Sequence, residues 1–383
     1  MKIVFTGGGT GGHFYPLIAI AESLHDLVAE QKLLPPQLYY LADKPYDEEA
    51  LFANDIVFLK APAGKVRRYF SLSNVTDVFV TAWGLVTSFF ILLKLYPDVI
   101  ISKGGYASVP TVLAASLLRI PIIVHESDAK PGRANLLGAK HAVRIAVAFE
   151  SAIEGFPAKL RNRVAKVGIP VRKELLNLPA KADAVAALGL DPTVPTVFIV
   201  GGSSGSLRIN ETALDALPNL VSFANVIHQT GKDHFAAVSA TGYVIIEKGG
   251  HENRYHPYPY LNVESMRNAA AAADVIITRA GTGSITEISL WGVPSILIPI
   301  PEAISHDQRT NAYAYAHTGA AVVLEEANLS PHVLASEAQR ISTDLAVASR
   351  MREAAKGFGN PLAGRLIAEE ALRIGLSHER KTD

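Results

Sequence analysis

The chain has 383 residues, too many for one ordinary hydrophobic core, so two domains are expected. Its 36 basic and 36 acidic residues cancel, which leaves no net positive field to attract nucleic acid. The absence of cysteine excludes disulfides, thiolate metal sites and a cysteine nucleophile, and it is compatible with a reducing compartment.

The N-terminus predicts a strand over residues 2–6, then a glycine turn and an amphipathic helix. No secretory signal pattern is present, so we expect the chain to stay in the cytoplasm. Gly7, Gly9 and Gly12 fit the G-x-G-x-x-G pattern, which lets backbone N–H groups and a helix N-terminus approach a diphosphate. One alternative is a nicotinamide or flavin dinucleotide site, although Asp43 lies beyond the usual position of its ribose-binding acid. A tight turn without a ligand is the other.

The segment from Lys65 to Lys94 combines cationic and aromatic residues with an apolar stretch. Its uncharged part, residues 78–93, holds 16 residues and would form a helix of about 24 Å, shorter than the roughly 30 Å hydrocarbon core of a bilayer. We therefore expect no transmembrane span but a helix in a membrane interface, with a buried helix of the first domain as the alternative. The side chains concerned are Arg67, Arg68, Tyr69, Phe70, Phe79, Trp83, Phe89, Phe90 and Leu92.

Two strand-and-turn patterns occur twice along the chain. The pattern of residues 2–12 returns at 196–205, and that of residues 98–105 returns at 274–281. Strands that alternate with helices and lack polar alternation predict parallel sheets buried on both faces. The expected fold class is therefore α/β, with two Rossmann-like, doubly wound parallel-sheet domains.

A hinge is expected at residues 168–172, because a proline after a short strand cannot continue a sheet. We expect an N-terminal domain over residues 1–168 and a C-terminal domain over 169–359. The final helix, within 360–383, is expected to pack back on the first domain by analogy with similar folds. Residues 336–355 are also expected to be helical.

Three titratable side chains end predicted turns or strands. His13 closes the first glycine run, and His125 and Glu126 end a strand. Each is a candidate general base, although a lone histidine is more often structural. The sequence holds neither an H-E-x-x-H helix nor an Asp-x-Asp pair, so we expect no metal and no cofactor. Helix N-termini, backbone amides and Arg172 would then face the charge of a diphosphate.

Two later segments carry polar groups suited to a nucleotide sugar. In Arg279–Glu287, the spacing of Ser284 and Glu287 predicts a capping box, whereas the functional interpretation has Glu287 accept hydrogen bonds from ribose hydroxyls beside a phosphate-facing helix N-terminus. His306–Ala312 is expected on a loop at the carboxyl edge of the sheet, where its side chains suit sugar hydroxyls. A solvated helix start is the alternative there.

In their order along the chain, these motifs resemble those of the MurG family. Its members are bacterial transferases that add N-acetylglucosamine to undecaprenyl-diphosphate-N-acetylmuramoyl-pentapeptide, converting lipid I to lipid II. The resemblance spans nearly the whole chain, and the ordered set is more specific than any one motif. The motifs are Gly7 to His13 with Phe14 and Pro16, Gly104–Gly105–Tyr106, His125–Glu126, Gly168 to Arg172, Gly201 to Gly205, Ala273–Asp274, Arg279 to Glu287, and Gln308 with Asn311–Ala312.

The resemblance implies a GT-B fold with the active site in an interdomain cleft. The acceptor would bind the N-terminal domain and UDP-N-acetylglucosamine mainly the C-terminal one. An inverting reaction is implied, in which the 4-hydroxyl of N-acetylmuramate displaces UDP in one step. The resemblance further implies a peripheral location on the cytoplasmic face of the cell membrane, through residues 65–94, with cell-wall synthesis proteins as partners and no nucleic acid.

The resemblance also implies roles for individual residues. His13 would act as the base or orient the acceptor diphosphate, with Glu126 as the alternative base. Val263 would offer backbone groups to uracil, Glu287 would bind ribose, and Gln308 would hold the sugar. The acceptor or diphosphate loops would contain Gly8, Gly9, Gly104, Gly105 and Tyr106. The full substrate-binding set is Thr10, Gly11, Gly12, Asp128, Arg172, Ser203, Val263, Thr282, Gly283, Ser284, Ile285, Thr286, Glu287 and Gln308.

The chain departs from the family pattern in three places, which together involve five residues. Ser127–Asp128 stands where the family has glutamine and asparagine, so an ionised Asp128 can only accept hydrogen bonds from the donor sugar. Ser204 replaces a common glutamine, and His306–Asp307 reverses a frequent order. Other classes stay open: a GT-B enzyme with another lipid or natural-product acceptor, a dinucleotide-dependent oxidoreductase, or a non-catalytic sugar-nucleotide-binding protein.

Overall fold

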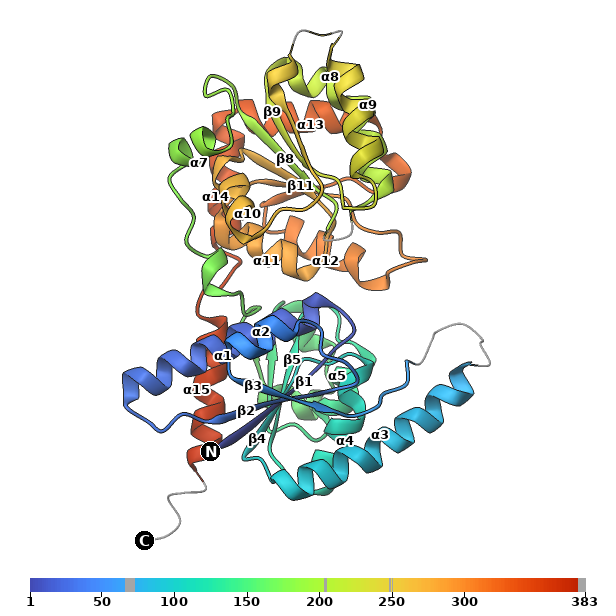
Figure 1. Ribbon diagram of the computed structural model, residues 1–383, viewed down its shortest axis with the longest axis vertical. Coiled ribbons are helices and arrows are strands. Elements are labelled where there is room, and N and C mark those ends of the chain that lie inside the picture. The colour runs from blue at the N-terminus through green and yellow to red at the C-terminus, as the bar shows by residue number, and fades with distance from the viewer. Residues whose placement is uncertain (66–72, 203–204, 248, 250, 378–383) are drawn as a thin grey trace. The chain divides into compact units, whose positions relative to one another are not determined.

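The chain divides into two α/β units, each built around a parallel sheet (Figure 1). The computed structural model describes residues 1–65, 73–202, 205–247, 249 and 251–377. The first unit comprises Met1–Lys173 and Asn360–Asp383, and the second comprises Glu174–Gly359. The segment expected to be a hinge, residues 168–172, belongs to the first unit.

The sheet of the first unit has seven strands among the described residues, in the order β3-β2-β1-β4-β5-β6-β7, and its pairings are parallel. The order reverses between β1 and β4, and open α/β sheets bind ligands at the carboxyl ends of the strands beside such a reversal. Strands β4 and β5 are buried along their whole length, because helices cover both faces of the sheet. The strands are β1 (Lys2–Thr6), β2 (Gln37–Ala42), β3 (Ile56–Lys60), β4 (Val99–Ser102), β5 (Ile122–Glu126), β6 (Arg144–Val147) and β7 (Val164–Lys166).

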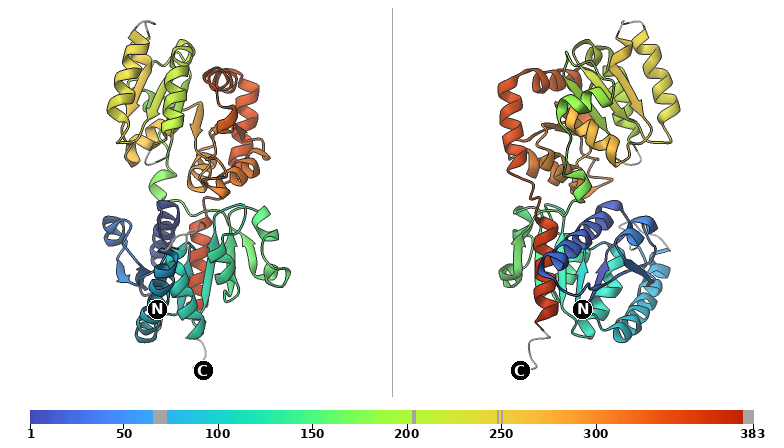
Figure 2. Two further views of the ribbon diagram at one scale, coloured as in Figure 1. Left: turned by 90° about the vertical axis from the view of Figure 1, so that its right-hand side faces the viewer. Right: turned by 60° about the vertical axis from the view of Figure 1, so that its left-hand side comes forward.

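The core of the first unit is completed by the last helix of the chain. Helix α15 (Ala363–Leu376) lies against α1 (Gly11–Gln31), as both views of Figure 2 show. Ile367 and Leu372 of α15 share one hydrophobic cluster with Leu24 of α1. The other helices of this unit are α2 (Glu48–Ala53), α3 (Ser73–Leu95), α4 (Val109–Leu117), α5 (Arg133–Ala139) and α6 (Ser151–Glu154).

Helix α3 packs along α4 (Figure 1). It has 23 residues and is about 34 Å long, so the 24 Å expected from its uncharged part was too short. By length and composition alone, Thr76–Leu95 could cross a membrane. One face, which includes Gly84, Ser88 and Leu92, is buried against the rest of the unit. Leu92, which the sequence grouped with interfacial side chains, therefore lies in the interior.

The second unit repeats the strand order of the first. Its six strands among the described residues run β10-β9-β8-β11-β12-β13, all parallel, and match β3-β2-β1-β4-β5-β6 position by position. The two patterns that repeat in the sequence form the two central strands of each sheet, which confirms the expected fold class. The strands are β8 (Thr196–Val200), β9 (Asn225–Gln229), β10 (Tyr255–Tyr258), β11 (Val275–Thr278), β12 (Ser295–Leu297) and β13 (Ala321–Val323).

One difference from expectation in the second unit is a helix break at Asp344. Asp344 accepts the N–H groups of Ala346 and Val347 and so caps a new helix, which divides residues 336–355 between α13 and α14. The helices are α7 (Lys181–Ala187), α8 (Leu207–Phe223), α9 (Phe235–Glu247), α10 (Val263–Ala272), α11 (Thr282–Trp291), α12 (His306–Ala316), α13 (Pro331–Thr343) and α14 (Leu345–Lys356).

Candidate functional site

The first glycine loop connects β1 to α1. The Tyr40 hydroxyl donates a hydrogen bond to the Gly7 carbonyl and holds the loop in place. Helix α1 begins at Gly11, after Thr10 in an extended conformation. The first N–H groups of a helix have no partner within it, so Gly11 and Gly12 present N–H groups and the positive end of the helix dipole. Such a turn is suited to an anion.

His13 lies in the first turn of α1. Its Nδ1 is 2.9 Å from the Thr10 Oγ1, and the imidazole is half-buried. Burial and the nearby Lys103 ammonium lower the pKa of His13 to about 4, so the ring is neutral at physiological pH. A neutral imidazole that donates through Nδ1 keeps the Nε2 lone pair for a proton. This geometry suits a general base.

The second glycine loop, after β4, touches the first. Gly105 has a φ of 77°, and a Cβ there would lie 2.7 Å from the Gly8 carbonyl oxygen, so the contact requires glycine. The ring of Tyr106 lies against Gly9, and its hydroxyl donates to Asp43 Oδ2 at 3.0 Å. Burial and this hydrogen bond raise the pKa of Tyr106 to about 12, so the phenol stays protonated. The structure thus brings both predicted acceptor loops together.

Glu126 ends β5 and accepts three hydrogen bonds. Its Oε1 accepts the Asp128 N–H at 2.9 Å, and its Oε2 accepts the Gly132 N–H at 2.8 Å and the Asn135 amide at 2.9 Å. The same Asn135 side chain lies against Gly104. Glu126 is only 2% exposed, and both of its carboxylate oxygens accept hydrogen bonds. This geometry favours a role in anchoring the loop after β5 over a role as a general base.

His125 and Arg172 are held by the first unit itself. His125 is buried, and its Nε2 is 2.8 Å from the Gly168 carbonyl oxygen. Burial and the Lys103 ammonium lower the pKa of His125 well below its usual value, so the ring is neutral. The Arg172 guanidinium lies 4.3 Å from the centre of the Tyr15 ring on α1. The structure therefore places Arg172 beside the helix that carries the first glycine loop.

Lys103 is a candidate that the sequence did not reveal. It follows β4 directly, is 1% exposed, and its ammonium donates to the Ser127 hydroxyl. Burial lowers its pKa to about 8, while the negative charges of Glu126 and Asp128 act in the opposite direction. A lysine in a glycine turn is usually exposed. Its place at the end of a fully buried strand was the signal that could have identified it.

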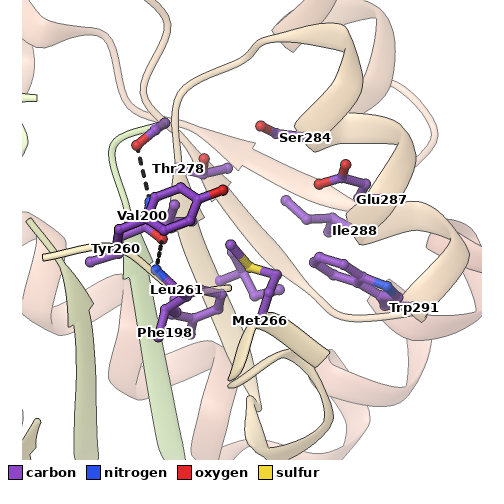
Figure 3. A pocket seen from close by; sticks show the side chains of 13 residues that line it. Phe198, Val200, Tyr260, Leu261, Met266, Thr278, Ser284, Glu287, Ile288 and Trp291 are labelled. Carbon is purple, nitrogen blue, oxygen red and sulfur yellow. Dashed lines mark hydrogen bonds between the residues drawn. The ribbon is translucent and has the colours of Figure 1, made fainter. Parts of the chain in front are cut away.

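The second unit has a pocket at the carboxyl edge of its sheet, with about 580 Å³ of space that opens to solvent. Figure 3 shows Ser284 and Glu287 on one helix, with Tyr260 and Leu261 on the opposite side. Apolar walls with few polar groups are typical of small-molecule sites. The lining residues are Phe198, Val200, Gly202, Gln229, Tyr260, Leu261, Met266, Ile276, Thr278, Ser284, Glu287, Ile288 and Trp291.

The predicted capping box at Ser284 and Glu287 is wrong. Helix α11 begins at Thr282 after Gly281, so Ser284 is the third residue of the helix and cannot be its cap. Ser284, Glu287 and Trp291 share the pocket face of α11, as their helical spacing requires.

The other predicted residues of α11 divide between its first turn and the core. Thr282 and Gly283 form the first turn, whose N–H groups have no partner within the helix. Ile285 is buried in the core, and the Thr286 hydroxyl donates to the Thr282 carbonyl at 2.9 Å. Of the six predicted residues, only Ser284 and Glu287 line the pocket.

Gln229 joins two sides of the pocket and was not predicted. Its Nε2 donates to the Gly202 carbonyl at 3.1 Å, and its Oε1 accepts the Leu261 N–H at 2.9 Å. Leu261 is followed closely by Val263, the first residue of α10, so the predicted backbone contact sits at a helix start. Met266, one turn further along α10, also lines the pocket.

The remaining predicted residues lie near the start of α12 or outside the residues that the structure describes. Helix α12 begins at His306, so the segment expected on a loop is helical. The Gln308 Oε1 accepts the Ile300 N–H at 3.1 Å and so holds the loop after β12. Ser203 lies outside the described residues. Nearby, Arg279 donates to the Ser206 hydroxyl at 2.7 Å, next to the start of α8.

Comparisons with known proteins agree over most of the chain. The N-terminal domain of glycosyltransferase family 28 matches residues 3–147, and its C-terminal domain matches residues 196–365. The UDP-N-acetylglucosamine–N-acetylmuramyl-(pentapeptide) pyrophosphoryl-undecaprenol N-acetylglucosamine transferase of Treponema denticola is 35% identical over 337 residues, which cover 86% of this chain and 85% of that protein. The enzyme of the same name from Halothermothrix orenii is 33% identical over 368 residues, covering 95% and 96%. Among solved structures, MurG of Acinetobacter baumannii has a TM-score of 0.74 at 25% identity and covers 97% of this chain and 99% of its own.

Proposed function

We propose that this protein transfers N-acetylglucosamine from UDP-N-acetylglucosamine to lipid I and so forms lipid II, because the chain belongs to the family of UDP-N-acetylglucosamine–N-acetylmuramyl-(pentapeptide) pyrophosphoryl-undecaprenol N-acetylglucosamine transferases. One structural observation carries the assignment of the donor: among its described lining residues, an apolar pocket in the second unit has one carboxylate, Glu287, together with Ser284 from the first turn of α11. An apolar wall for a base, an acceptor for hydroxyl groups and a positive helix end are the complement of a nucleoside diphosphate.

The donor would bind with its uridine in this pocket. The apolar side chains would cover the uracil ring, and the backbone at Val263 would meet its polar edge. The Glu287 carboxylate would accept hydrogen bonds from the two ribose hydroxyls. The first turn of α11, at Thr282 and Gly283, would offer N–H groups and dipole to the diphosphate, and Gln308 would contact the sugar.

The acceptor would bind the first unit through its own diphosphate. The loop of Gly8 and Gly9 leads into the uncapped first turn of α1, where Gly11 and Gly12 present N–H groups. The second glycine loop, with Tyr106, lies against the first. Two bare backbone loops at a helix N-terminus can approach a diphosphate more closely than side chains would allow.

The chemistry would be a single in-line displacement. The 4-hydroxyl oxygen of N-acetylmuramate attacks the anomeric carbon, and the bond to UDP breaks with its electron pair on the β-phosphate oxygen. His13 Nε2 takes the hydroxyl proton, which its neutral ring permits. One displacement inverts the α-linked donor to a β-1,4 product. Helix N-termini and Arg172 would stabilise the charge that develops on the leaving diphosphate.

The lipid part of the acceptor requires contact with a membrane, and α3 offers the surface. Phe79, Trp83, Val86, Phe90 and Leu93 are exposed, and their spacing places them on one face of the helix. The opposite face is packed within the unit, so α3 would lie along the interface on the cytoplasmic side instead of crossing the bilayer. Arg67, Arg68, Tyr69 and Phe70, which the sequence assigned to this surface, lie outside the described residues.

A transfer assay tests the proposal. Full-length protein is given radiolabelled UDP-N-acetylglucosamine and a short-chain lipid I analogue, without added metal. Label should enter the lipid fraction in a β-1,4 linkage. Binding of UDP without label in the lipid would contradict the transfer. Tight NADH binding without affinity for UDP would instead favour the dinucleotide-dependent class.

A further inference from the structure

The first unit buries an ammonium group at the carboxyl edge of its sheet. The Lys103 N–H bonds to the Thr6 carbonyl at 2.8 Å, so the residue continues the pairing of β4 with β1. Its Cβ would lie only 2.9 Å from a Cβ at position 7, and Gly7 leaves the room that the lysine stem occupies. The backbone of both strands therefore directs this side chain inward, where it is 1% exposed.

Four titratable groups from three segments interact electrostatically with this ammonium. They are His13 on α1, His125 and Glu126 on β5, and Asp128 on the loop that follows. The contact with the Ser127 hydroxyl fixes the ammonium at the start of that loop. Since both histidines are neutral, the cluster has a formal charge of +1 − 1 − 1, or −1.

The two carboxylates of this cluster differ in their surroundings. Glu126 is buried and accepts hydrogen bonds from two backbone N–H groups and an amide. Those dipoles already stabilise its charge. Asp128 is half-buried, so it is the carboxylate that a substrate can reach. A fully buried ammonium requires a counter-ion, because removing it from water costs several kcal/mol.

We propose that Lys103 is the counter-ion of Asp128 and that the two residues together set how this site binds the sugar. An asparagine at position 128 would be neutral and could both donate and accept, whereas the carboxylate can only accept. Without the ammonium, Asp128 would add a negative charge in the unit that carries the site proposed for the acceptor diphosphate. Lys103 thus acts through Asp128 as a positioning residue. The role in sugar binding rests on the proposed function; the pairing of the two charges does not.

A double-mutant cycle tests the pairing through its charge. Lys103→Met changes the cluster to −2, Asp128→Asn changes it to 0, and the double variant restores −1. We expect Lys103→Met to lower kcat/KM by about 30-fold, as truncating one member of a buried charge pair does. Adding Asp128→Asn should recover about tenfold of that loss. Lys166→Met, an exposed lysine on β7, should leave kcat/KM unchanged. Purely multiplicative effects of the two substitutions would overturn the proposal.

A second measurement separates this inference from the proposed function. Lysine labelled with ¹³C at Cε lets NMR follow the titration of Lys103 in the free protein, without any substrate. The pKa of Lys103 is about 8 in the native protein, and Asp128→Asn should lower it further, because the counter-ion is lost. An unchanged titration would overturn the pairing, even if Lys103→Met does not fold. A shifted titration in a native protein that transfers no sugar would refute the proposed function alone.

Discussion

The carboxyl edges of the two sheets have the same strand order and opposite chemistry. The edge of the first unit holds one cluster of an ammonium, two carboxylates and two neutral histidines, in which Lys103, His125 and Glu126 are buried and His13 and Asp128 are half-buried. The edge of the second unit holds an apolar pocket to which Glu287 contributes the carboxylate. One topology, repeated, thus serves two tasks, and the side chains that follow the central strands decide which.

The edge of the second unit is suited to substrate binding, and the edge of the first unit is suited to proton transfer. The pocket of the second unit offers apolar surface, whose burial contributes roughly 25 cal/mol per Å² to binding, and a few polar groups that fix orientation. The cluster of the first unit changes protonation equilibria, because burial and neighbouring charges favour the neutral forms of His13 and His125. Substitution of His13 at the first edge should therefore change kcat, and substitution of Glu287 at the second should change affinity.

Among the variants that test this difference between the two units, His13→Ala should have the largest effect. Loss of a general base should lower kcat by about 1,000-fold and leave the Kd for UDP unchanged. With a pKa near 4, His13 is unprotonated above that value, so the native rate should stay flat down to about pH 5 and fall only as pH approaches 4. The exposed His141 provides the control, and His141→Ala should behave as native. An unchanged kcat in His13→Ala would show that His13 is not the general base.

The second unit has a buried histidine of its own, His228, which should make the stability of the protein fall at acid pH. His228 lies 3.1 Å from Asn210 Oδ1 and 3.2 Å from the Tyr255 hydroxyl, and burial lowers its pKa to about 4. The unfolded chain takes up this proton first as pH falls below 6.5, so stability is lost between 6.5 and 4. At pH 5 the loss from this group is about 2 kcal/mol. Urea unfolding at pH 7.5 and 5 should show it, and His228→Gln should be less sensitive to acid.

The variant Glu287→Gln tests whether the pocket of the second unit binds a nucleotide through its ribose. The amide accepts more weakly than the carboxylate, so the Kd for UDP should rise about tenfold while kcat changes little. Titration calorimetry with UDP and 2′-deoxy-UDP gives the readout, because the penalty should shrink for the deoxy compound. Glu264→Gln, at an exposed position of α10, is the matched control. Equal losses with both nucleotides would place Glu287 away from the ribose.

The smallest effect concerns the membrane surface, which we assign to the first unit alone. Trp83 is 64% exposed on the apolar face of α3. Trp83→Ala should weaken binding to anionic vesicles about fivefold, through lost burial of the ring, and leave UDP affinity unchanged. Ala82→Ser, at an exposed neighbouring position, should bind vesicles as the native protein does. Equal vesicle binding by Trp83→Ala and native protein would argue against this face.

The sheets could be predicted from the sequence because buried parallel strands are apolar runs that end in glycine turns. Residues 2–12 and 196–205 carry this signal twice, and both became central strands. The ends of the helices were harder to predict. The backbone of Asp344 left the helical conformation to cap α14, and α3 extended past its uncharged stretch because polar residues at both ends are also helical.

Site residues could be predicted where the residue type itself indicates a role. They could not be predicted where the role depends on whether the side chain is buried. Glycine loops and His13 stood out, since few structural roles require them together. Lys103 and Gln229 did not, because the residue type alone does not tell whether a polar side chain turns inward; for Lys103, the apolar strand that it follows was the available signal. Ser284 was misjudged because α11 begins at Thr282, three positions earlier than a capping box at Ser284 requires.

The return of α15 to the first unit makes the core of that unit depend on residues that are synthesised after the second unit. Residues 174–359 leave the ribosome before α15 does, so the nascent first unit lacks the side chains that cover Leu24 and its neighbours on α1. A chain cut short at residue 359 would keep both sheets and expose this apolar surface to chaperones and proteases. A product truncated before α15 would therefore expose an apolar surface that quality control can recognise.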